Sequence, residues 1–481
     1  MDGDDHSWGF LSYPLQQTGT LATAMNRLVP LFILCVAVFA AHARGRDGAP
    51  ISYRVVRVPD AWLATAEVGG SQLRFAGDMR LGDLNGDGAA DLLIYRSAEG
   101  GFKPCFMAAL TVDAKPLWQI GSGGGQPVRP GSVLVHDIDG DGAAEVICFF
   151  LKDGPAGTPE DLKNVVVQVR DGRTGQVLRE AAPPEITQRR GKGANWVHHR
   201  IQAANFRGRP RAQDFVVKLG DTVVAFTDGL MVLWTYRVKW NKYGTHSAYI
   251  PAVGDIDGDG RDDVVGGYYL LNHKGESRWE KQLGKHMDSV AIAPWDDGRM
   301  RAICSGYGHV VSADGKVILK LGEKIVPHGQ EARIADFLPD SPGPEMIIRC
   351  NGHKPDVITV ANTGVVLHRF VLNDSPNHTG IEAIHWFGAG EPALLYNGGV
   401  LWHGDGRKFA ELSGLPKPVG DRKMGWYHCI PADVCGDARE EVVIYNPWDS
   451  RIWIYTAAGL NASAYKGYKA GPRQYNVRLM D

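Results

Sequence analysis

A nine-residue acidic loop occurs three times in this sequence and constrains the fold more than any other feature. The copies begin at Asp83, Asp137 and Asp255. Each has oxygen-bearing side chains at its positions 1, 3, 5 and 9, and a Gly at position 6 turns the chain sharply. Ca²⁺ takes about six to eight oxygen ligands, and this spacing supplies several of them from one short segment. The predicted ligands are Asp83, Asn85, Asp87, Asp91, Asp137, Asp139, Asp141, Glu145, Asp255, Asp257, Asp259 and Asp263.

These loops are not EF-hands. An EF-hand carries a bidentate Glu at position 12 and is flanked by helices, whereas position 12 is Ile94, Cys148 or Gly266 here. Each loop is followed at once by a run of β-branched, apolar or aromatic residues, which indicates a strand. We therefore interpret the loop as the entry to a strand in a repeated unit.

Weaker copies of the loop continue through the rest of the chain. The segments 336–345 and 433–441 keep acidic residues at both ends, and they add further predicted ligands: Asp336, Glu345, Asp433, Asp437 and Glu441. Three more segments, near residues 205, 295 and 386, keep only the layout of a turn before an apolar run. The anchors thus recur roughly every 40 to 70 residues in about eight units, which is typical of propeller blades.

Between the anchors the chain reads as hairpins. Short apolar runs are separated by turn sequences at 171–175, 313–316 and 361–364, and no long helical period follows the N-terminal region. These patterns predict an all-β protein. Blades arranged around a channel protect strand edges that an open sheet would expose, so we predict an eight-bladed β-propeller. A parallel β-helix is less favoured because its period would be about 20 to 30 residues.

Composition agrees with one large folded unit, which we assign to residues 44–481. The chain has 481 residues, 44% of them hydrophobic, and its 60 Gly fit a protein with many turns. The net charge of −2 argues against a partner such as nucleic acid that would be bound through a global positive field.

The N-terminal region predicts export. Residues 25–43 combine a basic start at Arg27, an apolar run and the small residues Ala41 and Ala43, which together form a signal-peptide pattern. Residues 1–24 are interpreted as a misassigned extension, the alternative being a genuine extension before a signal anchor. No second apolar stretch is long enough to span a bilayer. We expect a secreted or periplasmic protein.

Six cysteines remain once Cys35 leaves with the signal peptide, and an export context permits disulfides among them. Three, Cys148, Cys304 and Cys350, lie in apolar strand segments, where a free thiol packs as a small apolar side chain. Only Cys429 and Cys435 are close enough in sequence to indicate a local bridge. A CxxC metal pattern is absent from the sequence.

Several segments resemble a known family in the family's own order. They are 136–146, 169–178, 279–288, 328–345, 382–386 and 433–442. These segments are similar to the family 11 polysaccharide lyases, which are rhamnogalacturonan lyases, and the resemblance covers most of 80–481. It implies an eight-bladed propeller that uses Ca²⁺ for β-elimination within an acidic, rhamnogalacturonan-type polysaccharide. The family's extra β-domain before the first blade is not represented, because only residues 51–79 are available for it.

The resemblance also implies an active site, and the chemistry indicates what that site requires. Elimination across C4 and C5 of a uronate needs a cation to stabilise the developing negative charge and a base to take the C5 proton. The residues in the corresponding segments are His286, Asp288, His328, Arg333 and Lys423. His286, His328 and Lys423 are the candidate bases. The alternative for the 286–288 segment is a polar turn between blades.

Two questions stay open at the level of sequence. The basic segment 189–200, which contains Trp196, suits an acidic sugar, although a solvated loop is the simpler interpretation. The acidic loops also occur in integrin-type propellers with FG-GAP or VCBS repeats, which bind glycans or proteins without chemistry. A lyase is expected to gather His, Lys and Arg at one end of the channel, whereas a binding module is expected to scatter them.

Overall fold

The computed structural model describes residues 51–98, 103–125, 132–152, 165–188, 199–242, 244–295, 297–374, 380–419, 427–457, 465–468 and 470. Their regular structure is almost entirely β, apart from the 3-10 turn η1 (Asp60–Trp62) and the one-turn helix α2 (Pro184–Thr187). Neither helix in these ranges has the length and apolar character that crossing a membrane requires. The predicted extension 1–24, the predicted signal peptide 25–43, Lys423 and residues 189–198 lie outside the described residues.

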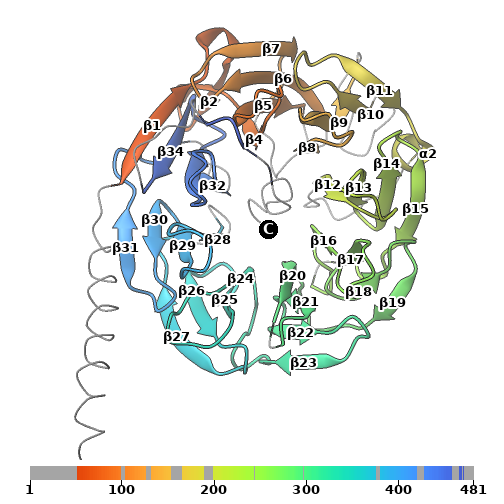
Figure 1. The fold of residues 1–481 in the computed structure, drawn as a ribbon, viewed down its shortest axis with the longest axis vertical. Coiled ribbons are helices and arrows are strands. Elements are labelled where there is room, and N and C mark those ends of the chain that lie inside the picture. The colour runs from red at the N-terminus through yellow and green to blue at the C-terminus, as the bar shows by residue number, and fades with distance from the viewer. Residues whose placement is uncertain are drawn as a thin grey trace, which may run out of the picture. The chain divides into compact units, whose positions relative to one another are not determined.

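Eight four-stranded antiparallel sheets are present in the described ranges, and Figure 1 shows them as blades around a central axis. The all-β, eight-bladed β-propeller predicted from the repeat is therefore confirmed. In seven of these sheets, strands that follow one another in sequence pair side by side, because short turns favour antiparallel neighbours. The eighth sheet has three such strands and takes its fourth from the N-terminal end of the described chain.

The first four blades are continuous in sequence. Blade 1 contains β4 (Asp78–Gly82), β5 (Asp91–Ser97), β6 (Pro104–Thr111) and β7 (Pro116–Gly121). Blade 2 contains β8 (Val133–His136), β9 (Glu145–Leu151), β10 (Val165–Arg170) and β11 (Val177–Ala181). Blade 3 contains β12 (Gln202–Ala204), β13 (Asp214–Leu219), β14 (Thr222–Thr227) and β15 (Val232–Arg237). Blade 4 contains β16 (Ala252–Gly254), β17 (Asp263–Val265), β18 (Tyr269–Leu271) and β19 (Ser277–Glu280).

The remaining blades follow the same plan until the last one. Blade 5 contains β20 (Val290–Pro294), β21 (Met300–Cys304), β22 (His309–Val311) and β23 (Val317–Lys320). Blade 6 contains β24 (Ala332–Ala335), β25 (Glu345–Arg349), β26 (Asp356–Val360) and β27 (Val366–Val371). Blade 7 contains β28 (Glu382–Ile384), β29 (Leu394–Asn397), β30 (Val400–Trp402) and β31 (Lys408–Glu411). Blade 8 contains β32 (His428–Ala432), β33 (Glu441–Tyr445), β34 (Arg451–Thr456) and the N-terminal strand β1 (Ser52–Arg57).

The ring is closed by pairing the two ends of the described chain. Strand β1 is the outermost strand of blade 8 and runs antiparallel to β34, from Ser52 opposite Thr456 to Arg57 opposite Arg451. A separate hairpin, β2 (Ala64–Val68) and β3 (Ser71–Phe75), follows β1. Within residues 51–79, β1 therefore completes the last blade, β2 and β3 form a separate two-stranded sheet, and the chain then enters β4 of blade 1.

Apolar side chains fill the spaces between neighbouring blades. One buried cluster joins blades 1 and 8 across the closure, and others join blades 2 and 3 and blades 4 and 5. At the closure, Asp78 of blade 1 accepts hydrogen bonds from Tyr95 of the same blade, at 2.6 Å, and from Tyr445 of blade 8. The cysteines Cys105, Cys148, Cys304, Cys350, Cys429 and Cys435 are free. The expected bridge between Cys429 and Cys435 is not formed, because they pack into different clusters, Cys429 from β32 and Cys435 from the loop after it.

The alternation of strand directions assigns each connection to one of two faces of the ring. The innermost strands, β4, β8, β12, β16, β20, β24, β28 and β32, lie nearest the axis in Figure 1. All of the sequence anchors fall between the first and second strand of a blade, where the innermost strand ends. We call this side the acidic-loop face. The side on which the innermost strands begin is called the entry face, and it also carries the turns between second and third strands.

Candidate active site and metal-binding groups

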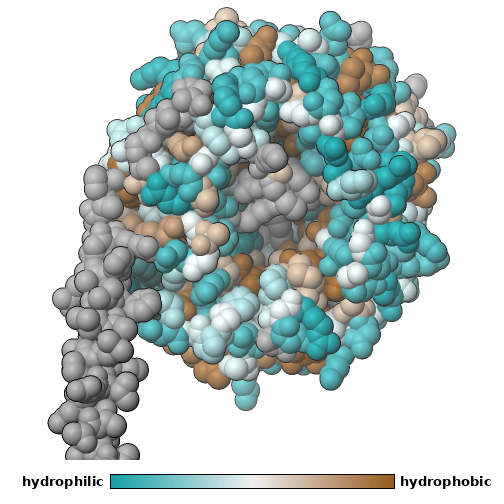
Figure 2. Space-filling view, in the orientation of Figure 1, coloured by the Kyte–Doolittle hydropathy of each residue, from teal (hydrophilic) through white to brown (hydrophobic). Residues whose placement is uncertain are grey.

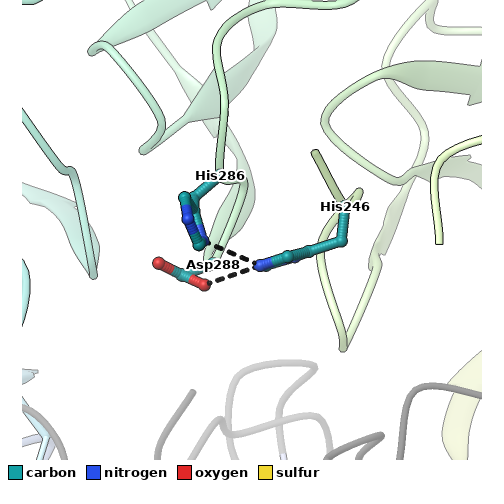
Figure 3. A group of neighbouring side chains, drawn as sticks. All are labelled: His246, His286 and Asp288. Carbon is teal, nitrogen blue, oxygen red and sulfur yellow. Dashed lines mark hydrogen bonds and ion pairs between the residues drawn. The ribbon is translucent and has the colours of Figure 1, made fainter. Parts of the chain in front are cut away.

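A group of imidazole and carboxylate side chains lies on the entry face, just before the innermost strands of consecutive blades. His246 precedes β16 of blade 4, His286 and Asp288 precede β20 of blade 5, and His328 precedes β24 of blade 6. Because these strands lie side by side around the axis, the segments that lead into them converge there. Figure 3 shows the edge of the His246 ring directed at both His286 and Asp288.

The ligand atoms of three residues meet closely enough to bind one metal ion. Nε2 of His246 lies 3.0 Å from Nδ1 of His286 and 3.6 Å from Oδ1 of Asp288. The three ligand atoms all lie within 4.8 Å of one another. Nδ1 of His246 faces the backbone carbonyl of Ser247 at 3.2 Å. When Nδ1 carries the proton and donates it to this carbonyl, Nε2 keeps its lone pair, which is directed toward the ligand atoms of His286 and Asp288. The residues therefore fit a divalent cation.

His328 and Tyr249 extend this group. Nε2 of His328 lies 2.9 Å from Oδ2 of Asp288, so the same carboxylate also contacts blade 6. The His328 ring lies 4.6 Å from the His286 ring, measured between centroids. The hydroxyl of Tyr249 is 2.9 Å from Nε2 of His246, so this nitrogen contacts Tyr249 as well as His286. Three of the predicted catalytic residues, His286, Asp288 and His328, are thus brought together.

Burial keeps the central imidazoles neutral. Desolvation lowers the pKa of His246 to about 4, partly offset by the carboxylate of Asp288. The pKa of His286 is also lowered, mainly by burial and further by the neighbouring imidazoles of His328 and His353. Neutral rings at neutral pH can bind a cation or accept a proton, and a protonated ring can do neither.

Arg333, the fourth predicted catalytic residue, has different partners. On β24 its guanidinium contacts Glu382 of blade 7 at 3.0 Å and Glu331 of its own blade at 3.3 Å. Glu331 is fully buried and also lies 3.6 Å from Arg349. The structure thus places Arg333 in a charge network that joins blades 6 and 7.

The acidic loops form a second class of candidate metal site, on the opposite face. Carboxylate oxygens of Asp137, Asp139 and Glu145 lie within 4.8 Å of one another, as do those of Asp255, Asp257 and Asp259. The Gly at position 6 has a positive φ in each copy, +83° at Gly88, +93° at Gly142 and +81° at Gly260, as the predicted sharp turn requires. All-oxygen groups of this kind suit Ca²⁺.

The last carboxylate, at position 9 of the loops or at position 10 in the segment 336–345, closes each loop from its buried end. Asp91 accepts hydrogen bonds from the backbone of Leu84 and Asn85, and Glu145, Asp263, Glu345 and Glu441 make equivalent bonds. Burial raises the pKa of Asp91, Glu145, Asp263 and Glu441 to about 7. Oδ1 of Asp91 is buried without a hydrogen-bond partner in the described residues, and such an oxygen fits a cation ligand.

Basic side chains contact several outer carboxylates of the loops. Arg173 contacts Asp141 at 2.8 Å, Arg211 contacts Asp137 at 3.5 Å, and further pairs join Asp87 to Lys466, Asp257 to Arg278 and Asp437 to Arg439. Most of these side chains are a third to a half exposed, so each pair adds little stability. They show that the loops attract positive charge. Asp83, Asp259, Asp336 and Asp433 lie in the corresponding loops on the same face.

Fold and site together define a β-propeller with a His and carboxylate group on one face and acidic loops on the other. No protein-family model matches the chain. The chain is 25% identical over 461 residues to the rhamnogalacturonan endolyase YesW of Bacillus subtilis (strain 168), covering 82% of this chain and 69% of that protein. It is 24% identical over 275 residues to the rhamnogalacturonan exolyase YesX of the same organism, covering 47% and 43%.

The fold of this chain is also similar to that of a solved rhamnogalacturonan lyase structure. The crystal structure of rhamnogalacturonan lyase YesW aligns with a TM-score of 0.63 and 22% sequence identity. The alignment covers 84% of this chain and 75% of that chain. The protein is therefore similar in sequence to rhamnogalacturonan lyases and shares their propeller fold.

His246 was missed by the sequence analysis although it lies at the centre of the group. It belongs to no recognised motif, and the segment around it, 243–249, carries no acidic loop. One signal was present in the sequence. His286 lies 40 residues after His246, and His328 lies 42 residues after His286, which matches the spacing of the blades. Side chains that recur at the blade period occupy equivalent places in neighbouring blades.

Proposed function

We propose that this protein is a metal-dependent polysaccharide lyase that cleaves a rhamnogalacturonan-type acidic polysaccharide by β-elimination. The observation that carries the proposal is the convergence of His246, His286 and Asp288, with His328 beside them, on one face of the ring. A lyase is expected to gather such residues at one end of the channel. Similarity to an endolyase and an exolyase supports the reaction class and leaves the mode of cleavage to experiment.

Each residue of the group has a distinct role. Nε2 of His246, Nδ1 of His286 and Oδ1 of Asp288 would hold a divalent cation. Such a cation, when bound, neutralises the carboxylate of a uronate and stabilises the charge that develops as its C5 proton leaves. Two imidazoles with one carboxylate favour a first-row transition ion, whereas the oxygen-only loops favour Ca²⁺, so the two faces are proposed to differ in metal preference.

The proton is proposed to move to an imidazole on the same face. His328 is the leading candidate among the described residues because Asp288 bonds its Nε2 and thereby orients the ring. Oδ2 of Asp288 would also stabilise the imidazolium that forms when His328 accepts the proton. Lys423 stays the alternative base proposed from the sequence.

Ca²⁺ in the acidic loops is proposed to stabilise the blades, because the loops join strands and lie on the face opposite the His group. The signal-peptide pattern at 25–43 supports a secreted or periplasmic protein, where an extracellular polysaccharide would be met.

The direct test is incubation with rhamnogalacturonan I and with other polyuronates while the ultraviolet absorbance of unsaturated uronate products is followed. Parallel reactions contain Ca²⁺, Mn²⁺ or a chelator, and His286→Ala is the inactive reference. We expect absorbance to rise only with a divalent cation and only in the parent protein. If the parent releases no unsaturated product from any polyuronate with either cation, the lyase assignment is wrong and a non-catalytic glycan-binding propeller replaces it.

A further inference from the structure

A lysine buried behind the His group has no part in the chemistry described so far. Lys218 lies on β13 of blade 3 and is 3% exposed. Its ammonium group donates to Oγ of Ser247 at 3.0 Å and to the backbone carbonyl of Ala248 at 2.6 Å. These acceptors belong to the two residues that directly follow His246. Lys218 therefore fixes the segment that carries a central member of the group.

The segment is held on its other side as well. Oγ of Ser247 donates to the backbone carbonyl of Trp240 at 3.1 Å, and the Ser247 N–H donates to the same carbonyl at 2.9 Å. The Ala248 N–H donates to the carbonyl of Gly266 in blade 4 at 3.0 Å. The carbonyl of Ser247 in turn faces Nδ1 of His246, which leaves Nε2 as the lone-pair atom. Lys218 therefore fixes the backbone that follows His246, and the Ser247 carbonyl in that backbone orients the His246 ring and favours a proton on its Nδ1.

Stability of the fold alone does not account for this lysine. Both acceptors are neutral, and within the described residues no carboxylate forms an ion pair with the ammonium group. Burial lowers the pKa of Lys218 to about 7, with Asp221 opposing the shift. A buried cation without a carboxylate partner costs free energy, and an apolar side chain of similar length avoids that cost. A residue kept at such a cost is expected to serve a site.

We propose that Lys218 is a positioning residue that holds the 246–248 segment so that His246 presents Nε2 to the metal shared with His286 and Asp288. The inference rests on the proposed metal site. Lys218 does not touch the metal or the substrate in this role. Its ammonium group holds Ser247 and Ala248 in place through its two hydrogen bonds.

The test is a Co²⁺ titration of the parent, of Lys218→Met and of a control, followed by visible absorption and by calorimetry. Co²⁺ bound through imidazole nitrogen is distinguished by its absorption from Co²⁺ held by the oxygen-only loops. Methionine is unbranched and nearly as long as lysine, so it fills the same space without donors or charge. The control, Lys103→Met, removes another buried lysine, one that lies before β6 in blade 1.

We expect Lys218→Met to bind Co²⁺ about 10 to 100 times more weakly at the His site, because loss of a residue that orients a metal ligand weakens metal binding by about this factor. Its melting temperature should be equal to or higher than that of the parent, and Lys103→Met should keep the parent's affinity. A purely structural lysine would give the opposite pattern: a lower melting temperature with unchanged affinity. Unchanged affinity in Lys218→Met therefore overturns the inference.

Ser247→Ala removes the Oγ acceptor with little change of volume, and it should weaken Co²⁺ binding severalfold. If Lys218→Met does not fold, Ser247→Ala tests the positioning role of Lys218 instead. An unchanged Co²⁺ affinity in Ser247→Ala would contradict that role. His286→Ala is the reference for the site itself. If the parent and His286→Ala bind Co²⁺ identically, the proposed metal site fails, which is a different outcome from failure of the role of Lys218.

Discussion

Nε2 of His328 lies 2.9 Å from Oδ2 of Asp288, while Oδ1 of the same carboxylate lies 3.6 Å from Nε2 of His246. One aspartate thus connects segments that enter blades 4, 5 and 6. A carboxylate held between two imidazoles can share a cation with one and stabilise a proton on the other.

Replacing His286 or His328 with Ala should reduce lyase turnover by about a hundredfold or more, because a metal ligand or a base is lost. Both side chains lie in segments on the entry face, away from the acidic loops, so the gain in melting temperature with Ca²⁺ should be nearly unchanged. Activity on rhamnogalacturonan I and a thermal melt with and without Ca²⁺ check the two parts. Full activity in both variants would contradict the assigned roles.

Gly352→Ala should impair activity more than a comparable backbone change elsewhere. Gly352 has φ of +58°, its N–H donates to the carbonyl of His328 at 2.7 Å, and a Cβ there would lie 2.9 Å from Nδ1 of His328. Alanine with a positive φ costs about 1 to 2 kcal/mol, and the added methyl must also displace the imidazole. The matched control is Gly322→Ala, with φ of +85° and open space around it. Equal activity in the two variants would show that His328 tolerates displacement.

Removal of Ca²⁺ should lower the melting temperature. A saturated site contributes roughly 3 to 4 kcal/mol at about a thousandfold excess of Ca²⁺ over the dissociation constant. Asp139→Ala should lower the melting temperature in Ca²⁺ and remove part of the chelator effect, because this residue is grouped with Asp137 and Glu145. The control is Glu323→Ala, an exposed acidic residue outside the loops, which should melt as the parent does. A melt that chelator does not change would mean that the loops hold no Ca²⁺ in solution.

The free energy of unfolding should fall as the pH is lowered from about 6.5 to about 4, in part because of His428. This imidazole is 2% exposed, and burial lowers its pKa to about 4, opposed by Asp78 and Asp374 and reinforced by Arg80. The unfolded chain then binds the proton more readily than the folded one, so acid favours unfolding. This lowering of the His428 pKa corresponds to a loss of about 2 to 4 kcal/mol in the free energy of unfolding once the pH has fallen below about 4.

His428→Phe is the variant that checks this contribution, because it keeps a ring beside Tyr445, whose centroid is 5.6 Å away, and does not titrate. Denaturant unfolding at several pH values should show a shallower loss of stability in the variant than in the parent. Identical pH profiles would indicate that His428 takes up no proton on unfolding.

The sequence by itself determined the repeat and hence the fold. Each anchor, from Asp83 to Asp433, lies between the first two strands of a blade, and the hairpins expected around 171–175 and 361–364 are β10–β11 and β26–β27. This succeeds because a blade is a local meander: its strands pair with neighbours in sequence, and its turns need residues that are visible there. Gly at position 6 of the acidic loops is such a residue.

The site was only partly visible in the sequence. His286, Asp288 and His328 were selected through the resemblance, and they lie together. Arg333 was selected with them, yet the tertiary structure gives it partners on blades 6 and 7. The pair of Arg333 with Glu382 is not predictable from the sequence, because the two residues are 49 residues apart and neither belongs to a charge pattern.

Only the tertiary structure showed which residues lie beside His246, Lys218 and β1. His246 contacts His286 of the next blade, and Lys218 donates to Ser247 beside His246. Strand β1 pairs with β34, which lies far from it in the sequence. The physical reason is common to all three. Closing the ring brings together segments that are distant in sequence, and a single side chain or strand carries no local signature of the neighbours it will meet.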